Sequence, residues 1–163
     1  MKIIFLDIDG VLNNRKTIQR PMIPWNGEHY HEFDPDCVHL LNYICNETGA
    51  LLVLSSSWRN GSEERFGSIK EYIANQGVET QIIARTPRAF QLFDENGDFT
   101  GRWSKRGLEI DKWLSERNDI DRFAIIDDDT DMKPHMDKLV KTEFDIGLQK
   151  CHMDPLLVLL GQK

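Results

Sequence analysis

The sequence lacks any apolar run long enough to cross a membrane. A spanning helix needs about 20 consecutive apolar residues, whereas the runs here are short, such as LLVLL at 156–160. The N-terminus carries one lysine and the run 3–6 before Asp7, which is too short and too soon acidic for a signal peptide. These absences predict a cytoplasmic protein with no membrane partner.

Cysteine and positive charge are also scarce. The three cysteines, Cys37, Cys45 and Cys151, show no CxxC spacing, so we expect neither a disulfide framework nor a zinc site. The formal net charge of −7 disfavours a general nucleic-acid coat protein. Basic residues still cluster locally, as at 102–106, and such clusters are either solvated surface charge or the place of one phosphorylated substrate.

What the sequence does contain is an alternation of strand and helix patterns. Continuous apolar runs predict buried strands at 2–6, 50–55 and 122–127, with weaker ones at 80–84 and 139–144. Helical spacing of apolar residues, together with capping residues, predicts helices at 34–49, 62–77 and 104–117 and a closing helix from 154. We therefore expect one domain over residues 1–163, an α/β/α sandwich with a mainly parallel sheet covered on both sides.

Two stretches fit neither pattern. Residues 10–33 contain Pro21, Pro24 and Gly27, which prevent a long element. The segment 94–101 contains Asn-Gly between polar residues, which predicts a hairpin turn.

Polar residues follow three of the predicted strands. The first strand runs into Asp7, Asp9 and Gly10, the second into 55-SSSWR-59, and the strand at 122–127 into 127-DDDTD-131. Ligands of such sheets bind beyond the carboxyl ends of the strands, so these groups should converge. Crowded carboxylates need a compensating charge, and an all-oxygen ligand set suits Mg²⁺. Hydroxyl and cationic groups would then suit a phosphate lying across the metal, namely Ser55, Arg59, Lys105 and Arg106.

The stretch 5-FLDIDGVLN-13 resembles the first motif of the haloacid dehalogenase (HAD) superfamily, a strand followed by DxDGxL. Ser55 after 51-LLVL-54 resembles the second motif, 105-KRGLEIDKWL-114 the third and 123-FAIIDDDTD-131 the fourth. In the third motif Arg106 stands where lysine is usual, with Lys105 just before it. LSSSWR and the RGxEIxxWL pattern further resemble the HAD domains of Swiss-army-knife RNA repair proteins. The resemblance spans about Lys2 to Asp131 and implies a HAD-like fold with a Rossmann-like sheet.

The resemblance implies a phosphatase reaction through an aspartyl-phosphate. Asp7 would be the nucleophile, which splits hydrolysis into two displacements. Asp9 would be the general acid and then the base, because residues i and i+2 of an extended strand face the same side. Gly10 would let the backbone turn sharply after the two acids.

The resemblance also implies the groups that hold metal and phosphate. Mg²⁺ would be bound by Asp7, the backbone carbonyl of Asp9, and Asp127 or Asp128, with Asp131 as an indirect partner. Ser55 would hydrogen-bond a phosphoryl oxygen, and either Lys105 or Arg106 would neutralise the charge of the transition state. Gly10, Ser56 and Arg59 are further candidates for substrate binding, although Arg59 could equally form a surface ion pair with Glu63.

The two intervals that hold large caps in many HAD phosphatases are short here, so we expect a minimal cap and an open cleft. An open cleft admits bulky phosphorylated substrates, such as polynucleotide ends or phosphoproteins. Alternatively, a neighbouring subunit could serve as the lid, although no obligate protein partner is evident.

The aromatic residues of 25–31, Trp25 and 29-HYH-31, are either surface residues or a stacking site for a planar group. Trp58 and Trp113 are expected to be packing residues, whereas Trp103 is undecided.

Two other functions are compatible with a parallel sheet and clustered acids. The first is a non-enzymatic phospho-acceptor like a response-regulator receiver domain, although receivers carry the acceptor after the third strand rather than the first. The second is an inactive HAD-fold binding module, which the full set of acids disfavours.

Overall fold

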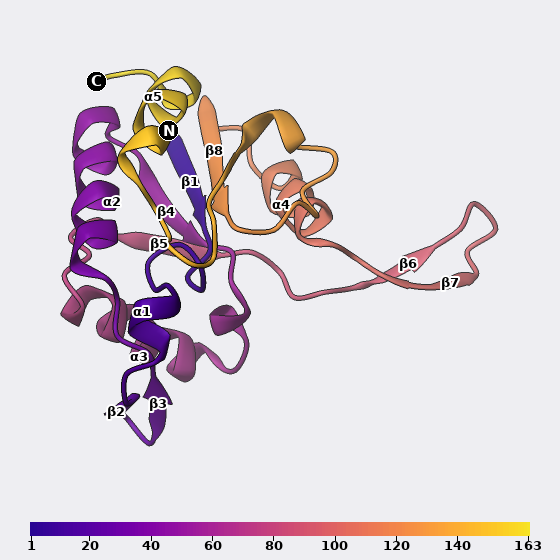
Figure 1. The fold of residues 1–163 in the computed structure, drawn as a ribbon. Coiled ribbons are helices and arrows are strands. Elements are labelled where there is room, and N and C mark those ends of the chain that lie inside the picture. Colours follow the sequence, from indigo (N-terminus) through magenta and orange to yellow (C-terminus); the bar gives the residue numbers. More distant parts are fainter.

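The computed structural model describes residues 1–163 and is built around a five-stranded parallel sheet (Figure 1). Its strands are β1 (Lys2–Leu6), β4 (Leu51–Leu54), β5 (Ile82–Arg85), β8 (Arg122–Asp127) and β9 (Leu139–Lys141). They lie in the order β5-β4-β1-β8-β9, which is 3-2-1-4-5 along the chain. This is the Rossmann order, whereas receiver domains have the order 2-1-3-4-5. The receiver-like alternative is therefore wrong in its topology.

Helices cover both faces of the sheet. The larger apolar cluster joins one face to α2 (Pro35–Thr48), α3 (Glu63–Asn75) and α5 (Met153–Leu160). The smaller cluster joins the other face to α4 (Arg106–Ser115), with Phe5 packed edge-on against Trp113 at 5.3 Å between ring centroids. The expected three-layer sandwich is confirmed, as is the packing role of Trp113.

Caps placed by the sequence define the helix ends. The Asp34 side chain accepts from the Asp36 amide at 3.0 Å, and Gly49 ends α2 at φ 72°, where a side chain would be strained. Ser62 caps α3 by accepting from the Arg65 amide at 3.2 Å. These helices begin and end within a residue or two of the predicted positions because the local capping chemistry is strong.

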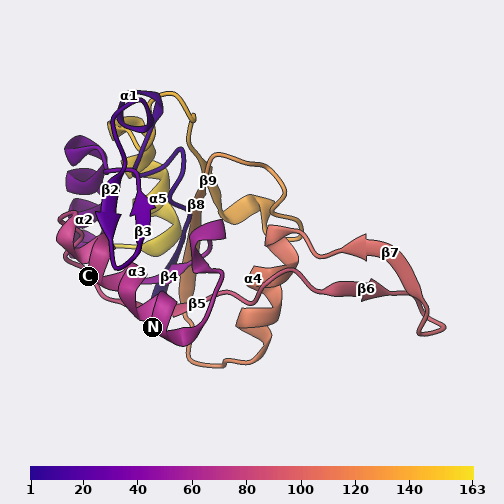
Figure 2. The ribbon, with the colours of Figure 1, turned by 90° about the horizontal axis from the view of Figure 1, so that it is seen from below.

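Two antiparallel hairpins stand outside the main sheet. The segment 10–33 holds only α1 (Arg15–Ile18), β2 (Ile23–Trp25) and β3 (Glu28–Tyr30), so it contains no long element, as predicted. The hairpin of β6 (Gln91–Phe93) and β7 (Phe99–Trp103) projects from the body as an arm (Figures 1 and 2). The remaining elements are three short 3₁₀ helices, η1 (Ser57–Arg59), η2 (Met136–Lys138) and η3 (Lys150–His152).

Neither hairpin has the size of a full cap domain, which agrees with the expected minimal cap. Trp103, undecided from sequence, lies on the arm and is 54% exposed. None of the helices combines the length and the apolar character that a membrane crossing requires.

Candidate functional site

Three polar residues form a row across the carboxyl ends of neighbouring strands. The pairing of Leu6 with Leu54 and with Ile126, extended by one residue, aligns Ser55, Asp7 and Asp127. The backbone ladder continues into this row, because the Asp7 amide donates to Ile126 O at 3.0 Å and the Ser55 amide to Leu6 O at 2.8 Å. All three side chains follow the period of two to the face covered by α4.

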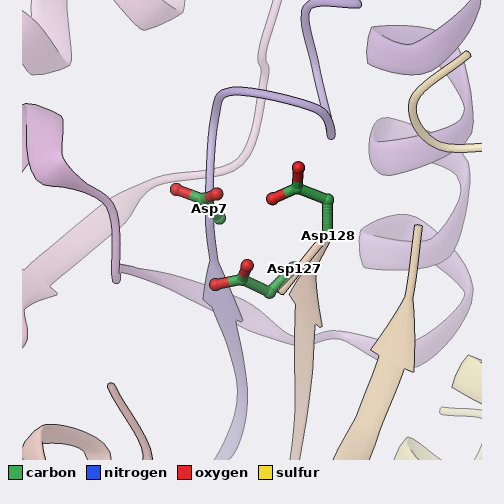
Figure 3. Close-up of side chains that lie close together, drawn as sticks. All are labelled: Asp7, Asp127 and Asp128. Atoms are coloured by element: carbon green, nitrogen blue, oxygen red, sulfur yellow. The ribbon is translucent and has the colours of Figure 1, made fainter. Parts of the chain in front are cut away.

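Three carboxylates gather at this edge. Asp7, Asp127 and Asp128 each offer an oxygen within 4.8 Å of the others, at the ends of β1 and β8 (Figure 3). Asp7 and Asp127 are buried and Asp128 is half-buried. We call these residues the three-acid cluster. Their oxygens could hold a metal ion, and both Asp127 and Asp128 belong to the set.

Burial makes these negative charges unfavourable. It raises the pKa of Asp7 to about 6, against the opposing charge of Arg106 and hydrogen bonds from the Ile8 amide and the Ser56 hydroxyl. Burial and then the charge of Asp7 raise the pKa of Asp127 to about 8. The pKa of Asp128 is also raised, chiefly by burial. The cluster therefore lacks positive charge, which is the condition that a bound cation relieves.

Of the two basic candidates at the start of α4, Arg106 faces the cluster. Its charge lowers the pKa of both Asp7 and Asp127, and its guanidinium donates to the backbone oxygen of Ser55. Lys105 is exposed and lines a separate shallow pocket with Leu108.

The start of α4 is held against the loop that follows β8. The amide of Gly107 donates to Asp131 O at 3.0 Å, and the Asp131 carboxylate accepts from the Arg106 amide at 3.4 Å. Asp131 thus contacts the first turn of α4 rather than the three-acid cluster. A Cβ at Gly107 would lie 2.2 Å from Lys133 O, so only glycine permits this approach, which carries Arg106 to the site.

Arg59 is buried rather than on the surface. Its guanidinium contacts Glu109 at 2.6 Å with both side chains 5% exposed, and it also donates to Ser56 O and Pro87 O. The alternative of a surface pair with Glu63 is wrong, because Glu63 pairs with Arg85. The donors of Arg59 are occupied by partners within the chain, and burial lowers its pKa to about 10.

Glu109 is a site residue that the sequence reasoning missed. Its carboxylate lies between two guanidinium groups, bonded to Arg59 and 3.9 Å from Nε of Arg106, and it accepts from Ser104 at 3.3 Å. The spacing of three residues from Arg106 on a helix was the available signal, since such residues share a face.

The serines after β4 have different surroundings. Ser56 is fully buried; its hydroxyl accepts from the Trp58 amide at 3.3 Å and lowers the pKa of Asp7. The Ser55 hydroxyl is buried without a hydrogen-bond partner, as is that of Thr86 at the end of β5. Buried hydroxyls normally have partners, so each of these unsatisfied groups can accept or donate to a ligand.

Asp9 is oriented differently from Asp7. One carboxylate oxygen accepts from Asn13 Nδ2 at 2.7 Å and the other from the Trp58 indole at 3.0 Å. Trp58 packs in the core as expected, but this hydrogen bond was not foreseen. Gly10 has φ +78°, and a Cβ there would lie 2.6 Å from the Asp128 carboxylate, so this turn requires glycine.

The aromatic residues of the β2–β3 hairpin separate into two groups. The Trp25 indole donates to Ser68 O at 3.2 Å and its ring packs edge-on against Tyr72, so Trp25 is a packing residue rather than a stacking platform. His29, Tyr30 and His31 line a pocket beside Asp9.

Comparison with known proteins agrees with this geometry. The family described as "HAD domain in Swiss Army Knife RNA repair proteins" matches residues 3–153. No match was found among the curated proteins. The matched range contains the three-acid cluster, Arg106 and both serines after β4. The chain belongs to the HAD domain family of Swiss Army Knife RNA repair proteins.

Proposed function

We propose that this protein is a Mg²⁺-dependent phosphomonoesterase that acts through an aspartyl-phosphate on Asp7. The observation that carries the proposal is the row of Ser55, Asp7 and Asp127, with Asp128 completing the acids and Arg106 facing them. A nucleophile, a metal-binding acid, a hydroxyl and a guanidinium thus lie together at one edge of the sheet.

The residues present fit a magnesium ion. The donor set consists of carboxylate oxygens, which Mg²⁺ prefers, and burial leaves their charge uncompensated. Asp7, Asp127 and Asp128 would hold the ion, with the backbone carbonyl of Asp9 as a further candidate. When bound, Mg²⁺ shields the phosphoryl oxygens from the charge of the nucleophile and orients the attack.

Each remaining group has a defined task in the reaction. An oxygen of Asp7 attacks phosphorus, and the bond from phosphorus to the leaving oxygen breaks while Asp9 donates a proton to that oxygen. Asp9 then takes a proton from water, which attacks the phosphoryl group and releases phosphate and free Asp7. Arg106 and the unsatisfied hydroxyl of Ser55 stabilise the charge on the phosphoryl oxygens.

Arg59 does not touch the phosphate in this scheme. Its ion pair with Glu109 fixes that carboxylate, which lies next to Arg106 and limits where the Arg106 guanidinium can point. Arg59 and Glu109 are therefore positioning residues.

For the substrate, we propose the phosphorylated end of a polynucleotide. The family takes its description from RNA repair proteins, and the catalytic edge carries only two small hairpins instead of an enclosing cap. Such an edge admits a chain terminus that a closed cavity would exclude.

The test is phosphate release from p-nitrophenyl phosphate and from oligonucleotides phosphorylated at the 3′ or 5′ end, each with Mg²⁺ or with EDTA. We expect turnover only with Mg²⁺ and none in Asp7→Asn. Because this change keeps the shape of the side chain, retained turnover in Asp7→Asn would disprove the assignment of the nucleophile. Turnover confined to small sugar phosphates would contradict the proposed substrate.

A further inference from the structure

A pocket of about 350 Å³ opens beside Asp9, between the β2–β3 hairpin and η1. Its walls carry groups with π-electrons or polarisable sulfur, contributed by Met22, His29, Tyr30, His31 and Trp58. None of these five residues has a role in the reaction proposed above, but that reaction places one part of the substrate next to them.

That part is the leaving group. Asp9 is the residue that protonates the leaving oxygen, so whatever this oxygen carries must lie on the Asp9 side of the phosphate. Asp9 itself lines the pocket, and its carboxylate is bonded to the indole of Trp58 in the pocket wall at 3.0 Å. The catalytic acid and the pocket are therefore one continuous surface.

The charges of the pocket exclude a second anionic group. The acids at its wall are Asp9 and Glu28, and the only guanidinium is that of Arg65. Arg65 donates to both oxygens of Glu28, at 2.7 and 2.8 Å, and to Trp58 O at 2.9 Å. No unpaired guanidinium or ammonium group remains for a phosphate or carboxylate, so the pocket disfavours an anionic leaving group and admits an uncharged one.

The walls are fixed before any ligand arrives. The Asn26 side chain donates to the Ser68 hydroxyl at 2.8 Å, and the Tyr72 hydroxyl donates to His31 O at 3.0 Å. With the Arg65–Glu28 pair, these bonds attach the hairpin to α3, beside which it lies in both views (Figures 1 and 2). A ligand would therefore bind without ordering the hairpin.

We infer that this pocket binds a planar, uncharged heteroaromatic group on the leaving side of the phosphate, the base of a nucleoside phosphate. The inference rests on the proposed function, because Asp9 defines the leaving side. The Met22 thioether offers a polarisable contact to a base, and the imidazole rings of His29 and His31 offer flat ones. His31, which lines the pocket, also has a buried Nδ1 without a hydrogen-bond partner. The base belongs either to a free nucleotide or to the last residue of an oligonucleotide.

The experiment compares substrates with and without a base. Phosphate release is measured for adenosine 5′-monophosphate and ribose 5-phosphate, which differ only in the base, and for a short oligonucleotide with a terminal phosphate. We expect kcat/KM to be about tenfold or more higher when the base is present. A higher kcat/KM for the oligonucleotide than for the mononucleotide would identify the chain end as the source of the base.

The pocket variants are Met22→Ala and His29→Ala, both at exposed positions, where truncation leaves the core intact. Each should reduce the ratio of kcat/KM between the two substrates, chiefly through KM. The matched controls are Met136→Ala and His39→Ala, which are also exposed but do not line the pocket. The controls should leave the ratio unchanged.

A binding measurement separates this inference from the proposed function. The affinities of Asp7→Asn for the same two phosphates are measured by calorimetry, so no turnover is required. Tighter binding of the nucleotide, reduced in Met22→Ala, supports the pocket even if the wild type hydrolyses neither compound. Equal affinities and equal kcat/KM values for the two compounds would overturn the inference, whether or not the protein is a phosphatase.

Discussion

Gly107 offers the sharpest test of how α4 is placed at the edge of the sheet that carries the three-acid cluster. In Gly107→Ala the new Cβ would lie 2.2 Å from Lys133 O, 2.3 Å from Met132 C and 2.4 Å from Met132 O. Carbon atoms prefer separations of about 3.5–4.0 Å, so the backbone at 132–133 must retreat by roughly 1 Å. Backbone atoms cannot rotate away as a side chain does, so the strain must distort the junction between β8 and α4.

The free energy of unfolding should fall in this variant by about 2 kcal/mol. Overpacking costs about 1–3 kcal/mol, and alanine returns at most about 1 kcal/mol through its higher helix propensity. For a chain of this size, that loss corresponds to a decrease in Tm of roughly 4–8 °C. Under the proposed function kcat should also fall, because Arg106 is the residue next to Gly107.

The matched control is Gly67→Ala, the same change within α3. No atom lies within 4 Å of a Cβ at that position, so the variant should be more stable than wild type by about 0.5–1 kcal/mol. Urea denaturation of both variants measures the two changes. If Gly107→Ala proved as stable as Gly67→Ala, the close approach of α4 to the loop after β8 would be refuted.

Three further predictions concern the charges of the site. Arg106→Ala should lower kcat by about 100-fold while Lys105→Ala leaves it near the wild-type value, and the reverse result would exchange their roles. Glu109→Gln leaves Arg59 buried without its counter-charge, so urea denaturation should show a loss of about 3–5 kcal/mol, and a near-neutral change would contradict the buried pair. Burial raises the pKa of Asp127 from 3.8 to about 8. In EDTA, the contribution of this group to the free energy of unfolding should therefore be greatest below the unfolded-state pKa and should be lost as the pH rises through about 8. Asp127→Asn should remove this decline, which denaturation at several pH values measures, whereas an unchanged pH profile would show that the decline has another source.

Much of the fold could be predicted because its signals are local. The apolar run predicted at 2–6 has the same bounds as β1. The start of α2 at Asp34-Pro35 and its end at Gly49 follow from capping residues that lie within a few positions of the helix ends. The convergence of Asp7, Ser55 and Asp127 could also be predicted, since parallel strands end at one edge.

The orientation of Asp9 could not be predicted in the same way. The i, i+2 argument assumes an extended chain, but β1 ends at Leu6 and the backbone then turns, with the Leu12 amide donating to Ile8 O at 2.9 Å. This turn brings Asn13 to one oxygen of Asp9, and η1 brings Trp58 to the other. The partners of Arg59 could not be predicted either, because its ion pair with Glu109 joins residues that are 50 positions apart in the sequence.

The β6–β7 arm has a consequence for how this domain can change in evolution. Its base is closed by two hydrogen bonds, from the Ser104 amide to Phe90 O at 2.8 Å and from the Phe90 amide to the Ser104 hydroxyl at 2.9 Å. The two chain ends are thus held together independently of what lies between them. Since each doubling of a loop costs only about 0.6 kcal/mol in closure entropy, much longer insertions can occupy this position. The arm marks the point where new substrate-recognising structure can be added without moving β5, α4 or Arg106.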